Sequence, residues 1–114
     1  MIARGSDAEA TALRYLQKQG LKLIAQNYRC RFGEIDLIMR DGNVVVFTEV
    51  RLRKSNAFGG ALASVDSHKQ RRILAAARHY LSELRETPYC RCDVVLLSEV
   101  NDQTLEWIQN AFTE

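Results

Sequence analysis

Two aliphatic runs on either side of an Asp-Gly pair constrain the fold of this 114-residue chain more than any other feature. The first run is Gly33–Arg40, the second is Asn43–Arg51, and Asp41-Gly42 lies between them. An Asp-Gly pair between β-branched and aliphatic segments is a strong signal for a tight hairpin turn. We therefore expect an antiparallel pair of strands joined by a two-residue turn at Asp41-Gly42.

The register of this hairpin decides which side chains share a face. If Arg40 pairs with Asn43, then Glu34 lies opposite Glu49, and Asp36 becomes the diagonal neighbour of Glu49. One face then holds Glu34, Asp36, Phe47, Glu49 and Arg51. The other face, which we expect to be core, holds Ile35, Leu37, Val44 and Val46. Three acids crowded on one face repel each other, so positive charge is expected nearby.

The source of that positive charge has two interpretations. A hard divalent cation such as Mg²⁺ takes oxygen ligands and binds with one or two carboxylates plus water and substrate phosphate. It would polarise a phosphoryl oxygen and generate hydroxide from water. Alternatively, Glu34 and Glu49 are surface acids neutralised by arginines, of which Arg29, Arg31, Arg51 and Arg53 are the candidates. The charge pattern alone leaves both interpretations open.

The rest of the chain predicts two helices and three more strands around the hairpin. An N-terminal helix begins at Ser6 and stops at Gly20, and a long helix covers about Asp66–Arg85. Further strands are expected at Leu21–Tyr28, Asp93–Leu97 and Leu105–Ile108. This order predicts an α/β protein, and a chain of this length fits a single domain, residues 1–114.

Glu9 has two roles compatible with its position in the first helix. With Ser6 it forms a capping box, which is a common helix-stabilising device. It also lies at the end of the apolar stripe of Ala12, Leu13 and Leu16, which should face the sheet. Glu9 is therefore either a capping residue alone or a capping residue that also serves the acidic site.

Composition restricts the class of protein. The net charge is only +2, so a nucleic-acid surface would need locally concentrated basic residues. The chain has three cysteines, Cys30, Cys90 and Cys92, and their spacing is not typical of a disulfide-stabilised domain. Reduced thiols are therefore favoured over disulfides, and a zinc site is the weaker alternative. There is no apolar run of membrane-spanning length and no signal-peptide core in Met1–Ala12, so we expect a cytoplasmic protein without membrane contact.

A group of basic residues follows the second hairpin strand. These candidate nucleic-acid contacts are Arg53, Lys54, Lys69, Arg71, Arg72 and Arg78. Such side chains contact phosphates and orient a nucleic acid without reading its sequence. The alternative is an ordinary solvated helix face, and His68 and His79 are interpreted as surface residues.

The hairpin also resembles a known family. Gly33-Glu34-Ile35-Asp36-Leu37-Ile38, the segment Val46–Arg53 and the early Ala8-Glu9 pair are similar to the YraN family of small bacterial proteins. The further matches are Phe58-Gly59, Val65 with Lys69 and Arg72, Tyr80-Leu81, Asp93-Val94-Val95 and Asn110-Ala111-Phe112. The resemblance implies a restriction-endonuclease-like core, with a mixed sheet of about five strands flanked by an N-terminal helix and one long helix. It further implies kinship with PD-(D/E)XK nucleases and Holliday-junction resolvases.

The same resemblance implies roles for the candidate active site, which consists of Glu9, Glu34, Asp36, Glu49 and Arg51. Asp36 and Glu49 match the two metal-binding acids, and Glu9 matches the helix-borne acid of the resolvase-like members. The implied cofactor is Mg²⁺ or Mn²⁺. The implied activity is metal-dependent endonucleolytic cleavage of DNA, with branched or structured DNA as the substrate; RNA and a homodimeric state stay open.

Arg51 departs from the family pattern, which has a catalytic lysine at this position. Lysine can lose its proton when it is buried, whereas arginine stays charged and is suited to clamping a phosphate. A nucleic-acid-binding module without turnover therefore stays open beside the nuclease. A third alternative is a protein-interaction subunit whose acidic face pairs with a basic partner.

Overall fold

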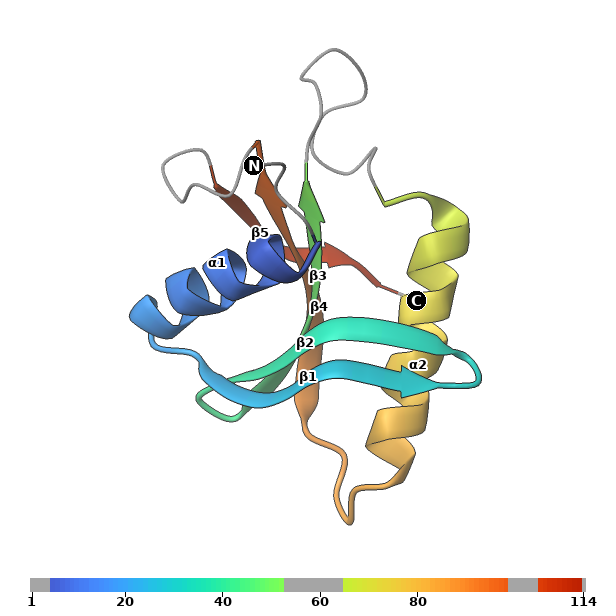
Figure 1. Ribbon diagram of the computed structural model, residues 1–114. Helices are drawn as coiled ribbons and strands as arrows, with labels where there is room; N and C mark the ends of the chain where they lie inside the picture. The colour runs from blue at the N-terminus through green and yellow to red at the C-terminus, as the bar shows by residue number, and fades with distance from the viewer. Residues whose placement is uncertain (1–4, 53–64, 99–104, 114) are drawn as a thin grey trace.

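The protein has one five-stranded sheet with a helix on each side, seen in a computed structural model that describes residues 5–52, 65–98 and 105–113 (Figure 1). The elements are α1 (Gly5–Lys18), β1 (Lys22–Cys30), β2 (Gly33–Asp41), β3 (Val44–Leu52), α2 (Ser67–Ser82), β4 (Tyr89–Leu97) and β5 (Glu106–Phe112). The strand order is β1-β2-β3-β4-β5. β3 and β4 pair in parallel, with α2 in the connection between them, and the other neighbours pair antiparallel. The predicted α/β class, with a mixed sheet and two helices, is confirmed.

The two helices cover opposite faces of the sheet, and each face has its own apolar core. The core beneath α1 contains Ala8, Ala12, Leu16, Leu37, Met39, Val46, Val95 and Leu97. The core beneath α2 contains Ile35, Ile38, Val45, Phe47, Ile73, Ala76, Val94 and Leu96. Both cores draw on β2, β3 and β4, so these central strands are apolar on both faces.

The predicted stripe and stop of the first helix are confirmed. Ala12 and Leu16 are fully buried, and Leu13 packs at the edge of the same core. Gly20, at φ 98°, ends the helix with a hydrogen bond from its own N–H to the Gln17 carbonyl, while Leu21 N donates to Leu16 O. The helix begins at Gly5, one residue before the predicted start, and the Ser6 side chain of the capping box lies outside the described residues.

The predicted hairpin exists, but its register is shifted. Asp41 is still part of β2 and pairs with Val44, so the turn is Gly42-Asn43 rather than Asp41-Gly42. Gly42 adopts φ 61° at the first turn position, a conformation that glycine adopts without steric strain. Asp41 is also held by the Arg91 guanidinium, with 3.2 Å between Nη1 and Oδ2.

The predicted assignment of faces was wrong for Ile35, which was placed with Leu37, Val44 and Val46. Ile35 packs in the core beneath α2, whereas Leu37 packs in the core beneath α1. The alternation breaks where Asn27 of β1, opposite Asp36, takes the left-handed conformation at φ 51°. Phe47, expected beside the acids, is buried in the core beneath α2.

α2 begins where predicted and is pressed against the start of β2. Asp66 caps it, since its carboxylate accepts a 2.8 Å hydrogen bond from Lys69 N. Gly33 touches the helix so closely that an added Cβ would lie 2.6 Å from the Arg72 carbonyl oxygen. Glycine at position 33 therefore permits this contact between hairpin and helix.

The last two strands are longer than predicted and are joined by a buried acid. Asp93 is fully buried and accepts hydrogen bonds from Arg91 Nε at 3.0 Å and from Trp107 Nε1 and Asn110 N at 2.9 Å. These bonds bridge the irregularity in the β4–β5 pairing between Cys92 and Val94. Asp93 thus has a structural role.

Two further observations concern the described part of the chain. None of its helices is long and apolar enough to cross a membrane. None of the three cysteines, Cys30, Cys90 and Cys92, forms a disulfide within the described structure.

Candidate active site

The site lies where β2 separates from β3. The last backbone pair between these strands is Leu37 with Thr48, so the neighbouring Asp36 lies just outside the ladder. Past the end of this ladder, a side chain replaces the backbone of β2 as the partner of β3. The Asp36 carboxylate accepts a 2.8 Å hydrogen bond from Val50 N. β3 itself stays paired with β4 as far as Leu52. In open α/β sheets, a crevice at the carboxyl end of a strand is the usual place for a ligand.

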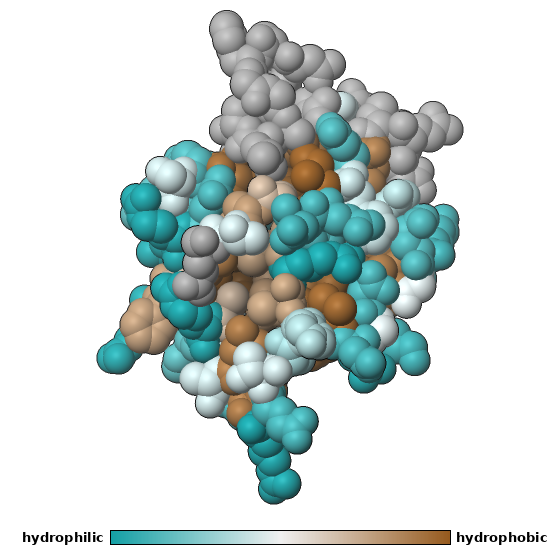
Figure 2. All heavy atoms as spheres, turned by 180° about the vertical axis from the view of Figure 1, so that it is seen from behind, coloured by the Kyte–Doolittle hydropathy of each residue, from teal (hydrophilic) through white to brown (hydrophobic). Residues whose placement is uncertain are grey.

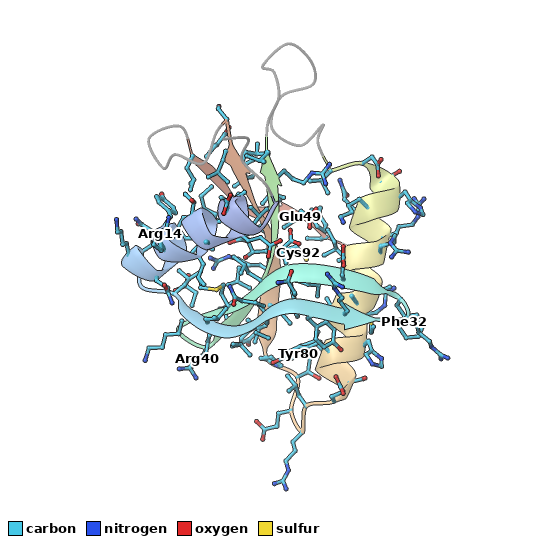
Figure 3. All side chains as sticks on the ribbon, in the orientation of Figure 1. Arg14, Phe32, Arg40, Glu49, Tyr80 and Cys92 are labelled. Carbon is cyan, nitrogen blue, oxygen red and sulfur yellow. The ribbon has the colours of Figure 1, made fainter. Side chains whose placement is uncertain are left out.

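Glu49 is the buried acid of this site. Its side chain is 3% exposed, and Oε2 lies 3.6 Å from both Lys69 Nζ and Arg51 Nη1. Oε1 is also buried and has no hydrogen-bond partner among the described residues. Figure 3 shows Glu49 near the middle of the molecule, between the start of α1, β2 and the first half of α2. A buried carboxylate oxygen without a donor is costly unless a proton or a cation satisfies it.

Burial raises the pKa of Glu49 from 4.5 to about 8, and the negative charge of Asp36 beside it adds to this effect. A hydrogen bond between the Glu49 and Asp36 side chains acts in the same direction. Lys69 and Arg51 oppose the rise in pKa without cancelling it. At neutral pH the two acids therefore share a proton unless a stronger positive charge replaces it.

Glu9 reaches the same region from α1. Partial burial raises its pKa, followed by the negative charge of Asp36, while a hydrogen bond from the Asn27 side chain and the charge of Arg29 lower it. Glu34 contributes a smaller rise. Glu9 therefore lies within electrostatic reach of Asp36 and is oriented by Asn27.

The structure brings the predicted residues together to different degrees. Asp36, Glu49 and Arg51 are adjacent, and Glu9 lies beside Asp36. Glu34 was predicted to face Glu49 but is half exposed and pairs with Arg29 of β1, with 3.4 Å from Nε to Oε2. In residues 5–52, 65–98 and 105–113, no three acidic, histidine or cysteine side chains are placed to hold one metal ion. Among the described residues, a cation here would rest on Asp36 and Glu49.

The contact between Lys69 and Glu49 was not predicted from the sequence. Lys69 was predicted to bind phosphate, yet its ammonium group lies against Glu49. The order of strand, helix and strand could have indicated this contact, because α2 connects the parallel strands β3 and β4 as a crossover helix. Such a crossover brings residues near the start of the helix close to the end of the preceding strand.

The basic residues of α2 divide between two sides of the helix. Lys69 lies toward β3, where it contacts Glu49, and Arg72 lies toward β2, where its Cβ approaches Gly33. Arg71 and Arg78 instead line a groove with Leu74 that faces the end of β5. Arg53 and Lys54 lie outside the described residues. The single broad basic face predicted from the sequence is thus two narrower ones.

A separate apolar groove lies between α2 and the last two strands. Its walls include Phe47, Leu74, Leu81, Cys90 and Phe112, and none of the described residues that line it is acidic. Figure 2 shows the back of the molecule, where apolar atoms are visible in the middle among hydrophilic side chains. This groove is therefore distinct from the acidic site at Asp36 and Glu49.

The five-stranded mixed sheet, the flanking helices and the paired acids at the split between β2 and β3 are consistent with the restriction-endonuclease-like class of α/β proteins. Residues 8–97 match the model of the uncharacterised protein family UPF0102. The chain belongs to this family, also known as the YraN family, as the resemblance in the hairpin predicted.

Relatives extend this match over nearly the whole chain. A UPF0102 protein of Psychromonas ingrahamii is 54% identical over 112 residues, covering 98% of this chain and 91% of that protein. A UPF0102 protein of Nitrosomonas europaea is 54% identical over 111 residues, covering 97% and 94%. A UPF0102 protein of Nitrosomonas eutropha is 55% identical with the same coverage.

Proposed function

We propose that the protein is a metal-dependent endonuclease that binds nucleic acid and hydrolyses its phosphodiester bonds at Asp36 and Glu49. The observation that supports this most directly is the burial of Glu49 beside Asp36, with one carboxylate oxygen lacking any donor in the described structure. Two acids forced together in a crevice destabilise the fold, and such arrangements concentrate at functional sites.

The residues present fit Mg²⁺ or Mn²⁺. Magnesium is commonly held by one or two carboxylates, with water and substrate phosphate completing its shell. Asp36 and Glu49 would provide the two carboxylates, and Val50 N–H already fixes one oxygen of Asp36. When bound, such a cation supplies polarisation of a phosphoryl oxygen and acidification of water.

The cations on the other side of Glu49 would act on the substrate. Arg51 and Lys69 each lie 3.6 Å from the same oxygen, and neither is fully buried. Once Glu49 turns to a metal ion, both side chains can move to a phosphate. Arg51 would clamp it, whereas Lys69 can also exchange a proton, a role that arginine does not take. Glu9 would stay beside Asp36, held by Asn27.

The proposed substrate is DNA, with RNA as the second test. Arg72 is exposed one turn after Lys69, so phosphates on either side of the scissile bond would meet positive charge along α2. We place this activity in the cytoplasm, in keeping with three cysteines that form no disulfide in the described structure.

A binding module without turnover is the second candidate, favoured by Arg51. An arginine beside the acids holds phosphate well and transfers protons poorly. The two candidates differ in cleavage and agree in binding. Substituting Arg51→Lys distinguishes them: a weakened nuclease should cleave at least as fast, and a binder should stay inactive.

The experiment that tests the proposal is incubation of the pure protein with Mg²⁺ or Mn²⁺ and a panel of linear, branched and single-stranded DNA and RNA. Cleavage by the wild type should disappear in Asp36→Asn, whose side chain can still accept from Val50 N. The matched control is Glu86→Gln, an exposed acid in the turn between α2 and β4, which should leave cleavage unchanged. Equal cleavage by wild type and Asp36→Asn would refute the assignment.

A further inference from the structure

The turn between β1 and β2 presents an aromatic ring to solvent. Phe32 is 41% exposed, although phenylalanine is usually buried. The Arg31 guanidinium lies over its ring, 4.9 Å from the centroid, and the His79 ring of α2 lies 5.5 Å away at a tilt of 53°. Figure 3 shows Phe32 at the tip of the hairpin beside α2. Three flat groups thus lie together on one surface.

This turn is held in place by backbone packing. Gly33 follows Phe32 directly and touches the Arg72 carbonyl so closely that no side chain fits between them. Farther along the hairpin, Tyr28 packs edge-on against Tyr80 of α2 and donates a 3.1 Å hydrogen bond to Glu83. Because the hairpin is anchored at both places, the turn that carries the exposed ring is held against α2.

The charges around Phe32 suit a nucleic-acid strand. Arg31 over the ring is exposed, Arg72 is exposed and lies against the neighbouring Gly33, and His79 beside the ring is half-buried. The acids of this region are already engaged, since Glu34 pairs with Arg29 and Glu83 accepts from Tyr28. A ring flanked by guanidinium groups combines base stacking with phosphate attraction.

The position of Phe32 relative to the acids sets the geometry. Phe32 lies in the turn directly before β2, and Asp36 follows four residues later, so they are at most about 13 Å apart at ~3.3 Å per residue. That span corresponds to about four stacked nucleotides at ~3.4 Å each. A single strand of nucleic acid can therefore lie along β2, with one base at the Phe32 ring and a phosphate at Asp36.

We propose that Arg31, Phe32 and His79 form a stacking site for an unpaired nucleobase. This inference rests on the proposed function and specifies its substrate class: nucleic acid with a single-stranded segment next to the scissile phosphate. Bases inside a duplex are already stacked on each other and cannot occupy the ring without being unstacked.

Fluorescence anisotropy in EDTA tests this site without requiring cleavage. The probes are a short oligothymidine, a blunt duplex and the same duplex with a single-stranded tail. Phe32→Leu should weaken binding of the oligothymidine and the tailed duplex by about fivefold or more, the loss of one base–aromatic stack. Binding of the blunt duplex should stay the same, and Phe32→Tyr should retain affinity.

The matched control is Tyr89→Leu, which removes an aromatic ring that is 83% exposed at the start of β4. It should change none of the three affinities. Unchanged binding of the tailed probe by Phe32→Leu, or an equal loss on all probes, would overturn the stacking site. A change in the sedimentation coefficient of Phe32→Leu without a change in binding would instead identify Phe32 as a contact between copies.

These outcomes separate the inference from the proposed catalysis. If the wild type binds the tailed probe through Phe32 but cleaves nothing with Mg²⁺, the stacking site stands and the nuclease assignment fails. If the wild type cleaves and Phe32→Leu binds as well as wild type, the stacking site alone fails. Absence of binding to every probe in EDTA would refute the stacking site, and absence of cleavage with Mg²⁺ or Mn²⁺ would separately refute the nuclease assignment.

Discussion

Replacing Glu49 with glutamine should stabilise the protein at alkaline pH, although it removes two ion-pair contacts. The folded protein holds the Glu49 proton up to a pKa of about 8, whereas the unfolded chain releases it near 4.5. Below pH 4.5 both states are protonated and the stabilising effect of the proton is fully present. As pH rises toward 8, the folded state binds more protons than the unfolded state, so the free energy of unfolding falls.

The magnitude follows from the same pKa values. The difference between about 8 and 4.5 is about 3.5, and each pH unit is worth about 1.36 kcal/mol, so the upper limit is about 5 kcal/mol. Glutamine resembles the protonated acid but leaves Lys69 and Arg51 without their partner, which offsets part of the gain. We therefore expect Glu49→Gln to be more stable than wild type by about 3 kcal/mol at pH 9 and by less than about 1 kcal/mol at pH 5.

The assay is urea unfolding followed by circular dichroism at pH 5, 7 and 9. Glu86→Gln provides the control, because its exposed side chain should show the same pH profile as the wild type. If the difference between Glu49→Gln and wild type stays constant across this range, Glu49 titrates as an ordinary carboxylate and the reasoning from burial is refuted.

Three further predictions concern packing and metal binding. Gly33→Ala should destabilise the protein by about 1–3 kcal/mol in urea unfolding, because its Cβ collides with the Arg72 backbone; a loss below about 0.5 kcal/mol would contradict the close contact. Asp93→Ala should cost about 3–5 kcal/mol in the same assay, since it leaves Arg91 underpaired among buried groups, and a neutral effect would contradict the structural role. Mn²⁺ affinity, measured by calorimetry, should rise by up to about tenfold per pH unit as pH approaches 8, because a proton must leave Glu49; a flat profile would contradict this competition.

The sequence predicted the elements of the fold well because each has a strong local signal. Gly20 ends α1 in the conformation that only glycine adopts easily, and Asp66 caps α2 through its own side chain. The apolar runs of β2, β3 and β4 predicted strands, which the structure buries on both faces. These features depend on neighbours within a few residues.

The register of the hairpin was not predictable in the same way. The local sequence fits a turn at Asp41-Gly42 as well as one at Gly42-Asn43. The second turn keeps Asp41 in β2, where it binds Arg91, which is 50 residues away in the chain. The change of face at Ile35 depends on the left-handed Asn27 of the neighbouring strand. Such effects come from tertiary contacts that local patterns do not contain.

The candidate site was predicted in part for the same reason. Asp36 and Glu49 come together because the observed register, continued past the end of the ladder, brings them opposite each other. Glu34 is separated from them where β2 leaves β3, and it pairs with Arg29. Lys69 joins them through the crossover helix, a contact across 20 residues that charge patterning could not distinguish from a solvated helix face.

The most direct test of the proposed metal site is Mn²⁺ binding followed by electron paramagnetic resonance at pH 8. Four proteins are compared: wild type, Asp36→Asn, Glu49→Gln and the control Glu86→Gln. The proposed site predicts that the wild type and the control bind one Mn²⁺ ion per chain, and that neither of the other two variants binds it. Equal Mn²⁺ binding by all four proteins would show that Asp36 and Glu49 are not its ligands.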